Sequence, residues 1–333
     1  MRLSRLAPLL ALLLCSCNGW QSALDPHGTS ALSLEQLILV IVTVCSVVWM
    51  LVMVALILAL GRNNPARPRP LRRDPGTTRR MSTAVLAAMV ATVMVIAGFT
   101  VMSFFTTRAL AVAGPDDLTI KVSGLQWWWN VQYPGDRADQ SFTTANEIHI
   151  PVGHTVRFQL EGDDVIHSFW VPSLAGKQDL IPGRPNELSI RAERTGIYRG
   201  QCAEFCGLQH AHMAFFVIAE DKADFDKWAK AQRQSAAQPT EAEAAAGQQA
   251  FLSKPCGACH AIRGTKATGT SGPDLTHVGS RKYIGAGLFE TTRGSLAAWI
   301  SDPQTLKPGN NMPLVPLSRD ELLSISAYLA SLK

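Results

Sequence analysis

Two long apolar runs without charge dominate the first third of the chain. They cover residues 37–60 and 81–105 and consist mainly of aliphatic side chains. At about 1.5 Å per residue each run forms a helix roughly 36 Å long, which exceeds a hydrocarbon core of about 30 Å. Buried core helices are the alternative, but two such runs close together favour a transmembrane helix hairpin over residues 32–108.

The segments that flank these runs predict the orientation of the hairpin. The connection at residues 61–80 carries seven arginines against one aspartate, and a short basic loop of this kind stays in the cytoplasm. Residues 1–17, with two arginines before a short apolar run, have the pattern of a signal peptide. Its end, Leu-Cys-Ser-Cys, resembles a lipoprotein signal in which Cys17 is acylated; a plain signal peptide is the alternative. We therefore expect a bacterial inner-membrane protein whose outer domains, after about residue 108, are periplasmic.

Short strands are predicted for residues 109–232. Apolar and polar residues alternate there in short segments that glycine and proline separate. Regular short strands are typical of an all-β sandwich or barrel. The clearest alternation covers residues 119–123, 147–150, 155–160 and 187–191, and a last strand is expected at 213–218.

A second outer domain follows a linker at residues 233–240. Residues 241–333 end in an amphipathic helix at residues 319–330 and show the pattern of an all-α domain. The net charge of +5 is unevenly distributed along the chain. Residues 1–108 carry ten basic and three acidic side chains, whereas residues 109–235 carry twelve basic and sixteen acidic side chains. The basic excess therefore belongs to the membrane part and indicates no nucleic-acid partner. The acidic β domain suits docking of a basic electron donor.

One loop of twelve residues concentrates soft metal ligands. It contains Cys202, Cys206, His210 and Met213, and His167 is available from a distant strand. Thiolate with imidazole selects copper or zinc over magnesium or calcium. A disulfide between the two cysteines leaves the histidine and methionine unexplained, and a zinc loop makes little use of methionine. Since two thiolates four residues apart can bridge two ions, the loop predicts a dinuclear copper site of cupredoxin-like type.

A second motif, Cys256-Gly-Ala-Cys-His260, predicts covalent attachment of c-type haem. Cys256 and Cys259 add to the two vinyl groups, and His260 becomes an axial iron ligand. A thioredoxin-like motif is the alternative, but it needs a βαβ pattern that is missing here. An electron carrier needs a second axial ligand, and Met312 is the candidate because no other methionine follows residue 213, with His277 as the second choice.

Residues 32–230 resemble subunit II of the haem-copper cytochrome c oxidases. The resemblance is carried by residues 164–172, residues 176–184 and the twelve-residue loop, behind two membrane helices. In that family six groups bind the dinuclear CuA centre, and all six are present in this chain. They map to His167, Cys202, the backbone carbonyl of Glu204, Cys206, His210 and Met213.

The resemblance implies further roles in the same domain. The Glu204 side chain maps to a ligand of Mg²⁺ at the boundary with subunit I, although a solvated loop charge explains it equally well from sequence. Trp127, in Gln126-Trp-Trp-Trp-Asn130, maps to the residue that receives electrons from cytochrome c; packing is the usual role of an aromatic residue in a strand. Three other histidines are not family ligands: His149, His154 and His212.

Residues 241–333 resemble a class I cytochrome c, in which Pro273 packs near the proximal histidine and Trp299 near the haem propionates. The whole chain thus resembles subunit II of the caa3-type oxidases. This resemblance implies that the chain accepts electrons at haem c from cytochrome c or another upstream donor and passes them through CuA to subunit I. Oxygen reduction and proton pumping then occur in subunit I, with subunit III as a further partner.

Three other functions compete with this interpretation. A quinol oxidase subunit II shares the fold but lacks the copper ligands. Nitrous oxide reductase contains CuA but does not begin with two membrane helices. A copper-delivery protein would not need a haem carrier on the same chain.

Overall fold

The computed structural model describes residues 19, 21–61, 75–110, 118–137 and 140–333. The chain divides into two compact units, Ser33–Val112 and the remainder. The expected signal peptide, including Cys17, and most of the arginine-rich connection lie outside the described residues.

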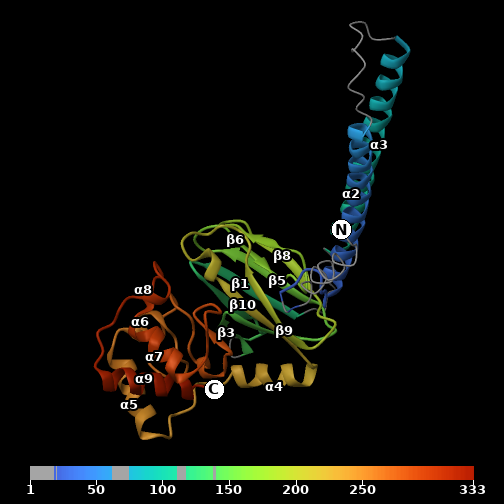
Figure 1. Ribbon diagram of the computed structural model, residues 1–333. Coiled ribbons are helices and arrows are strands. Elements are labelled where there is room, and N and C mark those ends of the chain that lie inside the picture. Colours follow the sequence, from blue (N-terminus) through green and yellow to red (C-terminus); the bar gives the residue numbers. More distant parts are fainter. Residues whose placement is uncertain (1–18, 20, 62–74, 111–117, 138–139) are drawn as a thin grey trace, which may run out of the picture. The chain divides into compact units, whose positions relative to one another are not determined.

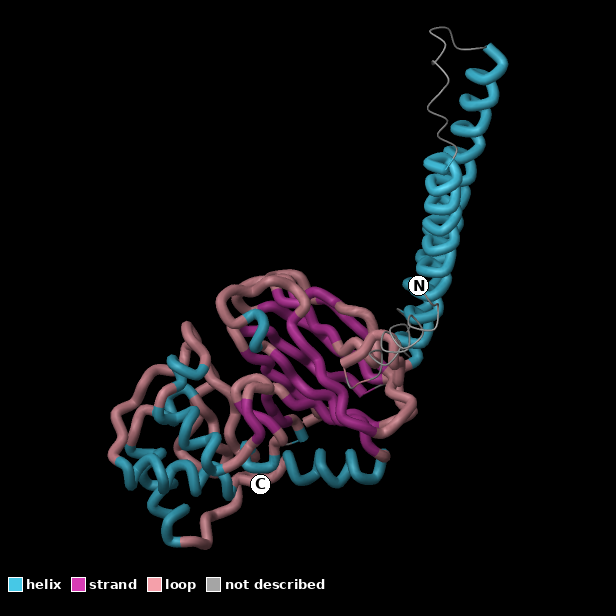
Figure 2. Tube along the Cα trace, in the orientation of Figure 1, coloured by secondary structure: helices cyan, strands magenta, loops and turns pink. Residues whose placement is uncertain are grey.

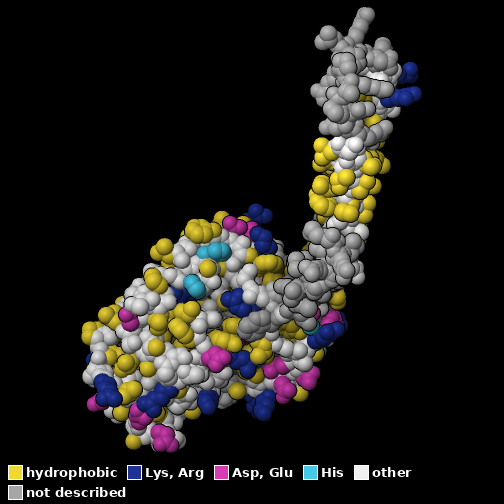
Figure 3. Space-filling model, in the orientation of Figure 1, with side chains coloured by type: hydrophobic (Ala, Val, Ile, Leu, Met, Phe, Trp, Pro, Cys, Tyr) yellow, Lys and Arg dark blue, Asp and Glu magenta, His cyan; other side chains and the backbone are white. Residues whose placement is uncertain are grey.

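Two long helices form the first unit. Helix α2 covers Thr29–Gly61 and α3 covers Pro75–Leu110, so each extends beyond the apolar run that predicts it. Both are long and apolar enough to cross a membrane. Large aliphatic side chains point outward along them, as at Leu51 (65% exposed) and Val85 (68%), and Figure 3 shows this hydrophobic surface. A continuous exposed aliphatic surface is what a membrane-spanning helix presents to lipid.

Two five-stranded sheets form the β domain (Figures 1 and 2). The strand orders are β3-β2-β1-β5-β8 and β4-β10-β9-β6-β7. Strand β1 pairs with β5 and β4 with β10 in parallel, and the other pairs are antiparallel. The strands are β1 Leu118–Leu125, β2 Trp128–Tyr133, β3 Phe142–Ala145, β4 Glu147–Pro151, β5 Val156–Gly162, β6 His167–Trp170, β7 Gln178–Leu180, β8 Asn186–Ile190, β9 Gly196–Cys202 and β10 Ala214–Glu220.

Alternating side chains fill the space between the sheets. Ile120 and Val122 of β1 are buried, and the fully buried rings of Trp129, Phe169 and Phe215 form the centre of the core. Trp129 contacts both phenylalanine rings edge-on. The strands predicted by alternation are therefore confirmed, and the sandwich has the layout expected of a cupredoxin-like domain.

Helix α4 (Lys222–Gln232) follows the sandwich and leads into the cytochrome domain. Residues 233–240 are irregular, and Ala236 among them is buried against this domain. The final helix begins with a capping box in which Ser318 and Glu321 exchange hydrogen bonds with each other's backbone amides. The elements are α5 Ala242–Ser253, α6 Cys256–Cys259, η4 Val278–Ser280, β11 Tyr283–Ile284, β12 Phe289–Glu290, α7 Arg293–Ser301, α8 Pro303–Leu306 and α9 Arg319–Ser331.

The crossing of α5 and α9 depends on the absence of a side chain at Gly247. A Cβ atom at this position would lie 1.9 Å from the carbonyl oxygen of Ser324. We predict that Gly247→Ala destabilises the cytochrome domain by about 1–3 kcal/mol, because the helices must separate. Gly294→Ala is the control, since its Cβ meets only Thr292 Oγ1 at 3.8 Å. Thermal unfolding followed by haem absorbance measures both; equal midpoints would contradict the prediction.

Candidate copper and haem sites

The loop between β9 and β10 brings two sulfur atoms together in the β domain. Cys202 and Cys206 are free, buried, and separated by 3.8 Å between their Sγ atoms. The Met213 Sδ lies 3.8 Å from Cys206 Sγ, and the Glu204 carbonyl oxygen lies 3.1 Å from Cys202 Sγ. A short loop closed by two paired strands thus directs four donor atoms to one point.

Two imidazoles complete the cluster from opposite sides. His167 Nδ1, from β6, lies 3.9 Å from Cys202 Sγ, and His210 Nδ1 lies 3.7 Å from Cys206 Sγ. The other ring nitrogen of His167 is held by Asp164 Oδ1 at 2.8 Å. A carboxylate on the outer nitrogen is the arrangement that orients a metal-binding histidine.

The cluster favours ionised sulfur. The hydrogen bond between the two thiols lowers the pKa of Cys202 to about 3 and raises that of Cys206. Burial lowers the pKa of His167, but its hydrogen bonds to Cys202 and Asp164 outweigh this and raise it overall. An ionised sulfur is the form of cysteine that binds a metal cation.

The donor set fits a pair of soft metal ions. A sulfur separation of 3.8 Å is less than twice a metal–thiolate bond of about 2.3 Å, so one ion can contact both thiolates. The two imidazoles lie next to different sulfurs, which gives each of two ions a histidine. The disulfide alternative is wrong for this structure, because both cysteines are free.

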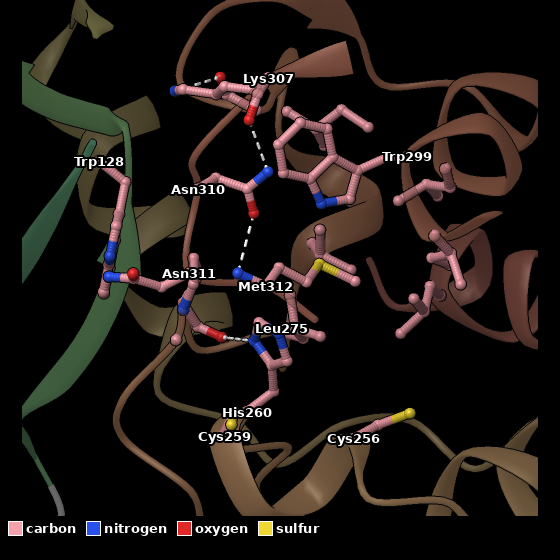
Figure 4. A pocket seen from close by; sticks show the side chains of 18 of the residues that line it. Trp128, Cys256, Cys259, His260, Leu275, Trp299, Lys307, Asn310, Asn311 and Met312 are labelled. Carbon is pink, nitrogen blue, oxygen red and sulfur yellow. Dashed lines mark hydrogen bonds between the residues drawn. The ribbon is translucent and has the colours of Figure 1, made fainter. Parts of the chain in front are cut away.

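A pocket of about 440 Å³ lies in the cytochrome domain (Figure 4). Cys256, Cys259 and His260 line it from α6 and the residue that follows, and Met312 and Trp299 also line it. His260 Nδ1 lies 2.8 Å from the Pro273 carbonyl oxygen. That bond places the proton on Nδ1 and leaves Nε2 as the metal-binding nitrogen.

The pocket fits a large apolar group that carries acidic substituents. Its lining is mostly aliphatic and aromatic, as in Leu275, Ile300 and Leu329. Arg281 also lines it, is buried, and has an Nε without a hydrogen-bond partner. Burial lowers the pKa of Arg281. A buried guanidinium with a free donor suits a carboxylate, and haem carries two.

Trp127 lies between the two sites. It occupies the turn between β1 and β2, one residue before β2 begins. The expectation that Trp127 belongs to a strand is therefore wrong. Its Nε1 donates to the carbonyl of Cys206 at 2.9 Å, and its indole also lines the haem pocket. Trp127 is 8% exposed. The side chain therefore contacts the copper loop and the haem pocket at once.

Other histidines have structural partners, as expected for residues outside the metal site. Both ring nitrogens of His277 contact backbone carbonyls, of Lys333 and Gln234, so the second choice for an axial ligand is not in the pocket. His149 is held between Glu147 and Glu220. His154 contacts the Val152 carbonyl, and the His212 ring is exposed.

Lys307 and Asn310, like Arg281, lie near the sites and were not identified from the sequence. Lys307 is 2% exposed, and its Nζ contacts carbonyl oxygens of both outer domains. Asn310 connects Lys307 to Met312 through its side-chain amide. A single lysine and a single asparagine carry no motif, because their partners lie far away in the sequence.

Comparisons with known proteins agree with the division into two outer domains. The family described as cytochrome c oxidase subunit II, periplasmic domain, matches residues 135–220, and the cytochrome c family matches residues 244–333. Cytochrome c oxidase subunit 2 of Alkalihalophilus pseudofirmus is 36% identical over 99% of this chain and 97% of its own length. The Bacillus subtilis subunit 2 is 33% identical over 66% of this chain and 63% of its own length.

One solved structure is similar to part of the chain. The periplasmic domain of subunit II of cytochrome oxidase of Bradyrhizobium japonicum is 34% identical, with a TM-score of 0.34, over 37% of this chain and 97% of that chain.

The fold and the sites define a membrane-anchored cupredoxin-like domain joined to a cytochrome c domain. The chain belongs to the cytochrome c oxidase subunit 2 family, in the form that carries a C-terminal cytochrome c domain. It is therefore an oxidase subunit, and a membrane protein with a periplasmic domain.

The buried ion pairs of His149 predict a pH-dependent contribution to stability. Burial lowers the pKa of His149, but hydrogen bonds to Glu147 (3.2 Å) and Glu220 (2.8 Å) raise it overall. A histidine whose pKa is raised in the folded state stabilises the fold. The stabilisation is complete below the pKa of the unfolded state, about 6.5, and is lost as the pH rises through the pKa of the folded state.

His149→Gln should therefore destabilise the β domain by roughly 3 kcal/mol in acid, with a smaller difference in base. Denaturant unfolding near pH 5.5 and near pH 9, on either side of the ordinary imidazole pKa of about 6.5, measures this. His154→Gln is the control at an exposed histidine. A difference from wild type that does not change with pH would refute the ion-pair explanation.

Proposed function

We propose that this chain is the electron-transfer subunit of an aerobic respiratory oxidase. When bound, its haem c and dinuclear CuA centre supply one-electron redox chemistry, taking an electron from an upstream donor and delivering it to subunit I. Oxygen reduction to water and proton pumping take place in subunit I. The observation that supports this most directly is the position of Trp127, which contacts the copper loop and lines the haem pocket.

The copper ligands are assigned to the residues that converge in the β domain. Cys202 and Cys206 would hold both ions through their thiolates, and the remaining donors would complete the site. Asp164 holds His167 in one orientation, which restricts movement of the ligand when the charge of the site changes. The remaining donors are His167, His210, Met213 and the Glu204 carbonyl oxygen.

The haem ligands are assigned to the pocket of the cytochrome domain. Cys256 and Cys259 would hold the haem through two thioether bonds, and His260 and Met312 would bind its iron. The Pro273 carbonyl fixes the tautomer of His260, which keeps Nε2 free for the metal. A methionine–histidine pair raises the haem potential relative to two strong nitrogen ligands.

Further parts of the proposal rest on the family. The Glu204 side chain binds Mg²⁺ at the boundary with subunit I, and subunits I and III are the partners. Residues 1–17 are a signal peptide, with Cys17 as a possible site of acylation. The chain lies in the inner membrane with both outer domains in the periplasm, which the two exposed aliphatic helices support.

Methionine exchanges distinguish the two sites. Met312→Leu should lower the haem potential by a sizeable fraction of the roughly 0.8 V that axial ligands span, while two coppers and the near-infrared absorption of mixed-valence copper are retained. Met213→Leu should perturb the copper signal and leave the haem potential unchanged. Purified oxidase from a host that attaches haem c covalently is used for both. An unchanged haem potential in Met312→Leu removes Met312 as a ligand, and one copper with a strong blue band removes the dinuclear site.

Trp127→Phe should slow electron transfer from haem c to copper severalfold, because it removes the hydrogen bond to the Cys206 carbonyl. Trp128→Phe is the control, since Trp128 lines the same pocket and the contacts described for it do not include the copper loop. Single-turnover kinetics after rapid reduction of the haem measure both rates. Equal effects of the two changes would refute a special role of Trp127.

A further inference from the structure

The segment 307–312, called here the Met312 loop, contacts the copper loop directly. Lys307 Nζ donates to the carbonyl oxygens of Trp127 and His212, both at 2.8 Å. Gln209 Nε2 donates to the Pro308 carbonyl at 2.8 Å. The loop that carries the haem ligand is therefore bonded to both turns that border the copper site.

All three hydrogen-bond donors of the Lys307 side chain are used. A lysine ammonium has three donors, and the third goes to the Gly285 carbonyl in the cytochrome domain at 3.1 Å. The side chain is 2% exposed, so water does not compete for these donors. With every donor used, none is left for a haem carboxylate, although Lys307 lies at the wall of the pocket. Burial lowers the pKa of Lys307 to about 7, and the negative charge of the Cys206 sulfur acts in the opposite direction.

A continuous path of hydrogen bonds connects Lys307 to the axial ligand (Figure 4). Asn310 Nδ2 donates to the Lys307 carbonyl at 2.7 Å, and Met312 N donates to Asn310 Oδ1 at 2.8 Å. Gln304 Nε2 also donates to the Met312 carbonyl at 2.9 Å. A displacement of Lys307 is thus transmitted to the backbone of Met312.

Further contacts near Lys307 join the β domain to the cytochrome domain. The Phe216 and Tyr283 rings stack with centroids 4.1 Å apart. Glu147 Oε2 accepts from Lys282 N at 2.8 Å. Phe216 is almost fully buried, although it belongs to an outer strand face of the sandwich. The two outer domains therefore share one packed surface with Lys307 close to Trp127.

We propose that Lys307 is a positioning residue that anchors the Met312 loop to the copper loop and so fixes the haem site relative to the copper site. This inference rests on the proposed electron-transfer function. Lys307 does not carry the electron itself. It acts through the backbone of Trp127 and of the Met312 loop. A buried ammonium suits this task, because its three bonds to neutral carbonyls are strong and point in three directions.

The test compares Lys307→Met, which keeps the length of the side chain without its donors, with Lys266→Met at an exposed lysine of the same domain. In the purified oxidase, Lys307→Met should slow haem-to-copper transfer about tenfold in single turnover. Reduction of the haem by an external donor should keep its wild-type rate, and both copper and haem contents should be retained. Lys266→Met should behave like wild type in every measurement.

Hydrogen exchange gives a readout that does not depend on electron transfer. Amides in residues 126–128 and 307–312 should exchange faster in Lys307→Met and not in Lys266→Met. If Lys307→Met shows wild-type rates of both electron transfer and hydrogen exchange, the proposed role of Lys307 is wrong. If wild type itself shows no transfer from haem to copper, the proposed function fails, while the exchange comparison still decides the anchoring role.

A variant that does not fold is replaced by a milder one. Lys307→Gln keeps two donors on a shorter side chain, which cannot reach all three carbonyls. It should show the same changes in transfer and exchange to a smaller extent. If Lys307→Gln matches wild type in both, or if Lys266→Met slows transfer as much as the Lys307 variants, the proposal is wrong.

Discussion

The geometry of the copper site depends on the closure of one short loop by paired strands. Strands β9 and β10 are antiparallel neighbours, and Cys202 N donates to the Met213 carbonyl at 2.9 Å at the base of the loop. The first and last ligands of the loop are therefore held next to each other before any metal binds. Only His167 must come from elsewhere, and β6 supplies it because it pairs with β9. Such preorganisation reduces the movement that a change of metal charge requires.

The same sheet also supports the second domain. Strand β10 is buried along almost its whole length, on both of its faces. One face packs into the sandwich through Phe215, and the other is covered by the β11–β12 hairpin through Phe216 and Ala214. In a sandwich that stands alone, the outer face of a sheet is commonly exposed to water. The strand that closes the copper loop is thus also the strand on which the cytochrome domain rests.

Local patterns explain what the sequence could predict. The alternation in β1, β4, β5 and β8 predicts the sandwich, because one face of each strand must be buried. The copper loop and the haem motif are also local, since five of the six copper-site groups lie within twelve residues and the haem motif within five. The Glu204 carbonyl is assigned only through the family resemblance, whereas the distant His167 is already a candidate before it.

Long-range contacts explain what the sequence could not predict. Lys307 meets Trp127 across 180 positions, and His149 meets Glu220 across 71. Arg281 has no motif, and only its buried free donor beside the pocket identifies it. Trp127 lies in a turn because β1 and β2 form a tight hairpin, which a run of three tryptophans does not indicate.

The docked cytochrome domain changes which surface an external donor can use. Trp127 is 8% exposed, and a Cβ atom at Gly309 would lie 3.6 Å from its ring, so the Met312 loop covers it. A soluble donor therefore cannot contact Trp127 while the two domains are packed together. In the proposed function the donor would then meet residues 236–333, which carry nine basic and seven acidic side chains, so the acidic charge of residues 109–235 says little about the donor. Burial of this tryptophan makes the cytochrome domain its immediate neighbour. Under the proposed function, the exposed surface of the cytochrome domain would therefore select the external donor.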